Sequence, residues 1–134
     1  MSRSFVQTTA PTAEPLSLAE AKAAARVEIA DDDADIARMI EAARVFFEEQ
    51  TRRQLITATW RLNLDDFPGV DDSILLPRPP LIAITSITYT DTDGNGQTLA
   101  SGNYEIDADS DPGRLHPTFG NEWPATRDSI YNAD

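Results

Sequence analysis

The side chains that come closest to a chemical motif lie in one short segment, DTDGNG at residues 91–96. Four of them match the first, third, fifth and sixth positions of an EF-hand calcium loop: Asp91, Asp93, Asn95 and Gly96. The twelfth position, which should be a bidentate glutamate, is Gly102. Because Asp, Asn and Gly also form tight hairpin turns, the segment is either a weak calcium site or a turn between strands.

Catalytic signals are sparse. The one histidine, His116, lies beside a proline next to an expected turn, where histidine is usually structural. The chain has no cysteine, and it lacks the Gly-x-Ser-x-Gly, phosphate-loop and His-Glu-x-x-His motifs. A small hydrolase built on a carboxylate pair such as Asp65 and Asp107 stays open as an alternative. We therefore expect no enzyme activity, no cofactor and no metal.

A proline-rich segment, ILLPRPPL, separates two apolar runs. Its Pro-x-x-Pro core, with Arg78 inside it, has the form of a docking peptide for another protein's aromatic groove. Proline also suits a corner, because it cannot donate to a strand ladder. Since the segment lies between expected strands, we interpret residues 77–80 as a stiff corner between strands at 74–76 and 81–90.

Two helices precede the strands. Residues 1–15 are rich in Thr, Ala and Pro, and predict an extended arm that needs a neighbour for order. The SLAE motif predicts a capping box at the start of a helix over about residues 17–28. The aspartates at 31–33 predict the start of a long second helix over about residues 33–54.

The second helix has the clearest apolar pattern in the chain. Its stripe follows helical spacing: Ile36, Met39, Ile40, Ala43, Phe46, Phe47 and Gln50. Burying its five large apolar groups is worth at most roughly 8–15 kcal/mol, so we expect the stripe to pack against something large. On another side of the helix, Glu48 with Arg52 and Glu49 with Arg53 are expected to form i,i+4 pairs.

From residue 56 the apolar period changes to two. One side of the predicted strand is expected to be buried: Ile56, Ala58, Trp60, Leu62 and Leu64. Further strands follow to about residue 107, one with a bulge near Thr85–Ser86, and SDPGRL is expected to be a turn. Trp123 is expected to be partly exposed. The order predicts an α+β fold: an N-terminal helical hairpin or bundle followed by a small antiparallel β-module.

Composition limits the function classes. The 134 residues are 40% apolar and suffice for a single domain. With 23 acidic and 11 basic residues, the net charge of −12 argues against gripping DNA or anionic lipid by charge. No apolar segment is long enough to span a membrane, and the first residues lack the apolar stretch of a secretory signal. We expect synthesis in the cytoplasm.

The order of motifs resembles tailed-phage head–tail connector proteins, also called adaptors, which occur in gene transfer agents as well. The matching pieces, from about residue 15 to 127, are LSLAEAK, TRRQLITATW, LPRPPL, ITSITYTDTDGNGQTL, YEIDADSDPGRL and WPATR. The resemblance implies a virion protein, assembled in the bacterial cytoplasm, that forms a homo-oligomeric ring of about a dozen copies in the neck. The ring would lie beneath the portal, extend the channel for DNA ejection without binding DNA specifically, and carry the next stopper or tail terminator protein.

The resemblance also implies surfaces for assembly. We expect residues 16–134 to be one connector domain whose helices contact neighbouring subunits. Candidate interface residues are Arg38, Arg44, Arg52, Arg53, Arg78 and Trp123. Family members usually continue past WPATR with another strand and helices, so the helical C-terminal part is expected to be absent here, through truncation or because this member is short. A calcium- or peptide-dependent interaction module remains the alternative function.

Overall fold

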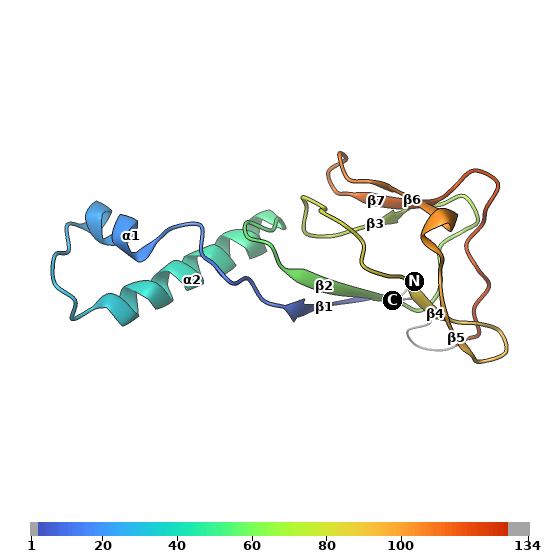
Figure 1. Ribbon diagram of the computed structural model, residues 1–134, viewed down its shortest axis with the longest axis horizontal. Helices are drawn as coiled ribbons and strands as arrows, with labels where there is room; N and C mark the ends of the chain where they lie inside the picture. The colour runs from blue at the N-terminus through green and yellow to red at the C-terminus, as the bar shows by residue number, and fades with distance from the viewer. Residues whose placement is uncertain (1–2, 129–134) are drawn as a thin grey trace.

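The protein has a helical arm at one end and short antiparallel strands toward the other (Figure 1). The structure is a computed structural model, and it describes residues 3–128. The predicted α+β class is confirmed. Within the described range, neither helix is long and apolar enough to span a membrane.

The arm consists of α1 (Leu18–Ala25) and α2 (Asp33–Thr51). The predicted capping box is present at α1: the backbone N–H of Glu20 donates to the Ser17 hydroxyl at 3.1 Å, and Ser17 N–H donates to the Glu20 carboxylate at 3.2 Å. Each helix ends earlier than expected, because the next residue, Arg26 or Arg52, has a left-handed φ of 58°. The two helices contact each other.

The N-terminal segment is ordered by its own chain. β1 (Arg3–Thr9) pairs antiparallel with β2 (Thr59–Leu64), and the register shifts between Gln7 and Thr9. The ring of Phe5 stacks on Trp60 with 4.5 Å between centroids. The segment is extended, as expected. The prediction that a neighbour must order it is wrong, because β1 forms its backbone hydrogen bonds with β2 of the same chain.

The remaining strands form two small antiparallel groups. One has the order β3 (Ile74–Leu75), β7 (Arg114–Pro117), β6 (Tyr104–Asp107). The other is a hairpin of β4 (Thr88–Thr90) and β5 (Gly96–Thr98), followed by the 3-10 turn η1 (Ser101–Asn103).

Two strand predictions need correction. Only residues 88–90 of the expected strand 81–90 are in a strand, so there is no ladder at Thr85–Ser86 for a bulge to interrupt. The strands also continue beyond residue 107, because β7 was not predicted. Its Arg, His and Pro residues do not show the apolar alternation of a strand.

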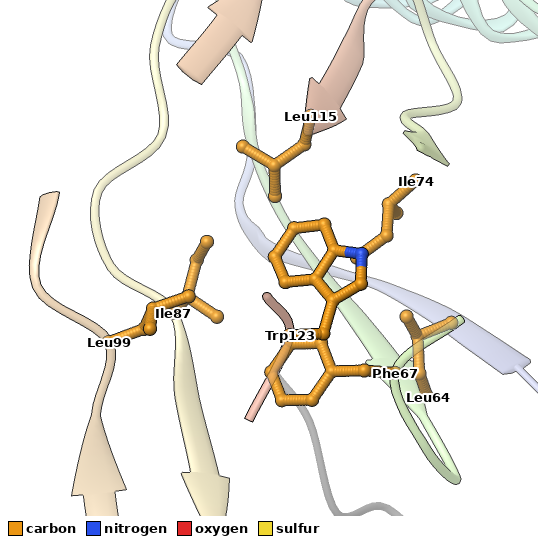
Figure 2. Packing of buried hydrophobic residues seen from close by; sticks show 7 residues of the cluster. All are labelled: Leu64, Phe67, Ile74, Ile87, Leu99, Leu115 and Trp123. Carbon is orange, nitrogen blue, oxygen red and sulfur yellow. The ribbon is translucent and has the colours of Figure 1, made fainter. Parts of the chain in front are cut away.

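The core lies among the strands. It is a cluster of seven buried side chains: Leu64, Phe67, Ile74, Ile87, Leu99, Leu115 and Trp123 (Figure 2). Trp123 stacks on Phe67 with 5.1 Å between ring centroids, and its indole N–H donates to the carbonyl of Asp72 at 2.8 Å. The expectation of a partly exposed Trp123 is therefore wrong, because both its ring and its polar atom find partners inside the module.

The apolar stripe of α2 does not face this core. Of the predicted stripe only Ile40 is buried, whereas Met39 and Phe46 are each 67% exposed and Phe47 is also exposed. The residues that α2 buries are Ile40, Arg44 and Glu48, spaced four apart. Within the described chain the stripe therefore does not find the large packing partner that we expected. The arm projects away from the strands, and most of the residues that α2 buries are polar.

Candidate functional site

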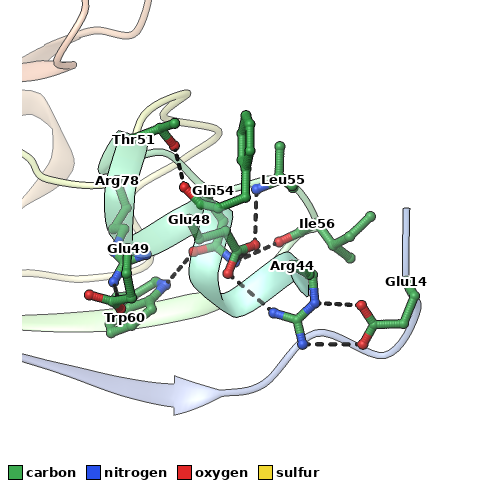
Figure 3. Close-up of polar contacts among 11 residues, drawn as sticks. Glu14, Arg44, Glu48, Glu49, Thr51, Gln54, Leu55, Ile56, Trp60 and Arg78 are labelled. Carbon is green, nitrogen blue, oxygen red and sulfur yellow. Dashed lines mark hydrogen bonds and ion pairs between the residues drawn. The ribbon is translucent and has the colours of Figure 1, made fainter. Parts of the chain in front are cut away.

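A polar network joins the helical arm to the strands (Figure 3). At its centre, the guanidinium of Arg44 binds both oxygens of Glu14, at 2.6 and 3.2 Å, and one oxygen of Glu48 at 3.1 Å. Arg44 is only 7% exposed. Its pKa is raised, first by the hydrogen bond to Glu14, so the cation is secured between two carboxylates.

The second oxygen of Glu48 organises the link between α2 and β2. It accepts hydrogen bonds from the backbone N–H of Leu55 at 3.1 Å and from the side-chain amide of Gln54 at 3.2 Å. Gln54 in turn donates to the carbonyl of Ile56 at 2.9 Å and accepts from the indole of Trp60 at 3.1 Å. A continuous path of hydrogen bonds therefore connects α2 to β2.

The proline segment closes the other side of this junction. The backbone N–H of Gln54 donates to the carbonyl of Pro79 at 2.9 Å. Arg78 has a φ of 63°, its guanidinium contacts Glu49, and it lies over the Trp60 ring at 5.0 Å from the centroid. An uncommon left-handed conformation at a non-glycine residue persists only where its surroundings hold it.

The segment is consequently part of the fold and not a free docking peptide. Pro79 is buried, and the Arg78 side chain is only 11% exposed. We expected the corner to lie between a short strand at 74–76 and a long strand at 81–90. It instead follows β3 and bonds to the chain just after α2, because residues 81–87 belong to no strand.

The candidate interface residues divide into two groups. Arg44 and Arg78 are engaged inside the chain, and Trp123 is in the core, so the structure places none of these three where a partner could use it freely. Arg38, Arg52 and Arg53 are exposed. Of these, Arg38 contacts Asp35 and Arg53 contacts Asp111.

The predicted pairs at the end of α2 are replaced by others. Glu48 pairs with Arg44, not Arg52, and Glu49 pairs with Arg78, not Arg53. The reason is local: α2 ends at Thr51, so Arg52 and Arg53 leave the helical spacing that the i,i+4 pairs require.

The suspected calcium loop is a hairpin turn. One carboxylate oxygen of Asp91 accepts from the backbone N–H of Asp93 at 3.0 Å and of Asn95 at 2.9 Å, and the other accepts from the Gln97 amide at 2.9 Å. These hydrogen bonds, Asn95 first, lower the pKa of Asp91. In the part of the chain that the structure describes, no group of three His, Asp or Glu could hold a metal.

The candidate catalytic groups have structural partners. The ring nitrogens of His116 lie 2.7 and 3.1 Å from the carbonyl oxygens of Pro117 and Asp71. Asp107 accepts from Arg114 at 2.8 Å, and this bond is the main cause of its lowered pKa. A carboxyl with a lowered pKa is ionised at neutral pH, so it is poorly suited to donate a proton to a substrate.

Several exposed large apolar side chains lie together on α2: Met39, Val45, Phe46 and Phe47. We define the α2 outer face as Met39, Ala43, Phe46 and Gln50, which are exposed, uncharged and spaced three or four apart, with Phe47 beside them. The helical period of these residues is visible in the sequence, but nothing in the sequence indicates that they are exposed. Clustered exposed apolar side chains are typical of contact surfaces.

The chain is similar to known phage proteins. The model of the phage gp6-like head–tail connector protein family matches residues 15–110. No curated protein matches the sequence. Among solved structures, a chain in the neck of an empty GTA particle, computed with C6 symmetry, has 22% identity and a TM-score of 0.77. The match covers 92% of this chain and 65% of that chain, so the two share a fold and the present chain spans less than two thirds of its relative.

Proposed function

Because this chain belongs to the phage gp6-like head–tail connector family, we propose that it is a structural component of the virion neck that joins head to tail. The observation that carries the proposal is the family match over residues 15–110, which includes both helices, the junction except Glu14, and the β4–β5 hairpin. The role requires shape and contacts rather than bond chemistry.

In this proposal the chain works as a homo-oligomeric ring of about a dozen copies, which is a closed cyclic arrangement. The ring lies beneath the portal and offers a platform to the next neck or tail protein. A similar fold in the neck of a particle computed with C6 symmetry supports a ring. Residues 16–134 act as one connector domain, with a helical hairpin in the ring wall and the strands as an added module.

The charge of the chain supports a passive channel. At −12 per copy, a ring presents DNA with a strongly negative surface, so the duplex is repelled from the wall and slides through it. We expect weak duplex binding at physiological salt. A sub-micromolar affinity in a gel-shift titration at that salt would contradict a passive channel.

The role as connector is tested by mixing the protein with purified portal rings. Mass photometry and negative-stain electron microscopy are measured on the mixture, with portal alone and connector alone as controls. We expect a second ring stacked on one end of the portal, with a mass increase of many copies. Portal particles unchanged at saturating connector would contradict the proposal.

The polar junction has a role in this proposal as well. A ring wall and its added module must keep a fixed angle in every copy for the contacts to repeat. The hydrogen-bonded path from Glu14 through Arg44 and Glu48 to Gln54 and Trp60 is suited to hold that angle. Arg38, Arg52 and Arg53 stay candidates for charge contacts with neighbouring acids, since they are exposed on or just after α2.

A further inference from the structure

The α2 outer face is an apolar surface without cover in the described chain. Met39 and Phe46 are each two thirds exposed, and Ala43 and Gln50 continue the same side of the helix. Within residues 3–128, α2 makes its internal contacts through a different side, at Ile40, Arg44 and Glu48. Large apolar groups grouped on one helix side and left in water indicate a surface that another molecule covers.

Building on the proposed ring, we propose that a second copy of this chain covers the α2 outer face, in a head-to-tail contact between neighbouring subunits. The first argument is electrostatic. Two copies that each carry −12 repel one another, so they must meet where acids are absent. The four residues that define the outer face, from Met39 to Gln50, include no charged side chain.

The second argument concerns area. A mostly exposed Phe or Met side chain offers on the order of 100 Å² of surface. Met39, Phe46 and Phe47 together therefore offer a few hundred Å², well below the roughly 800 Å² per partner of a stable two-protein interface. The face is thus too small to hold a free dimer, but it suits a contact that is repeated around a ring, where each copy is held on both sides.

A head-to-tail contact needs a different patch on the second copy. The outer side of α1 meets this requirement, because Ala19 and Ala23 are exposed one turn apart on the same arm. The nearest charged groups already have partners within the chain: the Glu20 carboxylate accepts from the Ser17 N–H, and Lys22 binds Asp33 at 2.6 Å. The large side chains of α2 provide the contact, and the alanines leave room for close approach of the helices.

The chain has no cysteine, so introduced thiols report the contact cleanly. The test variant carries Ala23→Cys together with Phe46→Cys, the controls carry each change alone, and a further control pairs Ala23→Cys with Phe119→Cys, at a fully exposed turn among the strands. Each is oxidised in concentrated solution and in the portal-bound ring. We expect a ladder of disulfide-linked multimers for the first pair alone.

The failures are distinguishable. Rings seen by electron microscopy without a ladder would overturn this contact and leave the connector role intact. Dimers from Phe46→Cys alone would show that two α2 faces meet symmetrically, which overturns the head-to-tail contact. Absence of rings contradicts the connector role. The solution experiment then tests the contact by itself, because oxidation traps even a weak contact as a disulfide, and no excess of linked multimers over the Ala23/Phe119 control pair would overturn it.

A second pair of variants excludes effects on folding. Phe46→Asp is compared with Phe119→Asp, because both side chains are exposed and neither change should move the melting temperature appreciably. We expect Phe46→Asp to lower ring formation about tenfold or more, as expected for an interface anchor, and Phe119→Asp to leave it unchanged. Equal ring formation by both variants would overturn the proposal.

Labelling separates a second copy from cover by the chain itself. In dilute monomer, the thiol of Phe46→Cys should react with maleimide as fast as that of Phe119→Cys, and it should become protected when rings form. A thiol at 46 that is already slow to react in the monomer would mean that the same chain covers the face, which overturns the proposal.

Discussion

The buried guanidinium of Arg44 gives the most demanding test of the junction. Arg44→Met keeps the approximate length of the side chain but leaves Glu48, whose side chain is 5% exposed, without its cation. Removing one partner of a buried ion pair costs roughly 3–5 kcal/mol. We expect the lower end, about 3 kcal/mol of unfolding free energy, because the Glu14 side chain is 30% exposed and can recover water.

Two further variants test whether the unpaired Glu48 carboxylate causes the loss of stability in Arg44→Met. Glu14→Gln leaves the Arg44–Glu48 pair in place and should cost about 1 kcal/mol. The double variant Arg44→Met/Glu48→Gln removes both charges while the introduced glutamine keeps an oxygen for the Leu55 N–H, so it should be more stable than Arg44→Met alone. Urea denaturation followed by tryptophan fluorescence measures all of these, since Trp60 lies at the junction. A cost under about 1 kcal/mol for Arg44→Met, the range of an exposed pair, would refute the reasoning.

Three other changes have defined outcomes. Trp123→Ala should lower the unfolding free energy by about 3–5 kcal/mol, as for other buried aromatics, because it removes the stack on Phe67 and the bond to Asp72; a loss below that in urea denaturation would contradict its burial. Arg78→Ala should cost about 1 kcal/mol and alter Trp60 fluorescence, because it removes a cation over that ring; an unchanged spectrum would argue against the contact. The pKa of Asp91 is lowered in the folded chain. Its ionised form therefore stabilises the fold at pH values above the ordinary carboxyl pKa, and this stabilisation is lost as pH falls through the folded pKa. The melting temperature of Asp91→Asn should consequently fall less on the acid side than that of the unchanged protein, and the difference between the two should be nearly constant above about pH 5.

The parts of the fold that depend on neighbouring residues were predictable from the sequence. Ser17 and Glu20 form the capping box at α1 because both partners lie within four residues. The period of two from residue 56 predicted β2, and the Asp, Asn and Gly of 91–96 predicted the β4–β5 turn once the calcium alternative was set aside. The α+β order follows from the same local signals.

The parts that depend on distant residues were not predictable. The periodicity of α2 identified an apolar side but did not reveal whether the chain itself covers it, and the structure leaves Phe46 exposed. Arg44 reads as a surface residue, since its partner Glu14 is 30 residues away in an irregular segment. Trp123 lies among polar and proline residues, yet its stacking partner Phe67 arrives from a loop much earlier in the chain. In each case the deciding contact is tertiary.

The central claim is that this chain works by mechanical fit in the neck between head and tail. Its most direct test is electron cryomicroscopy of particles that were assembled with the chain. We expect a closed ring directly beneath the portal, with density in every copy that fits the helical arm and the strand module as one unit. A neck in which that position is filled by a different protein, with this chain absent from the purified particles, would contradict it.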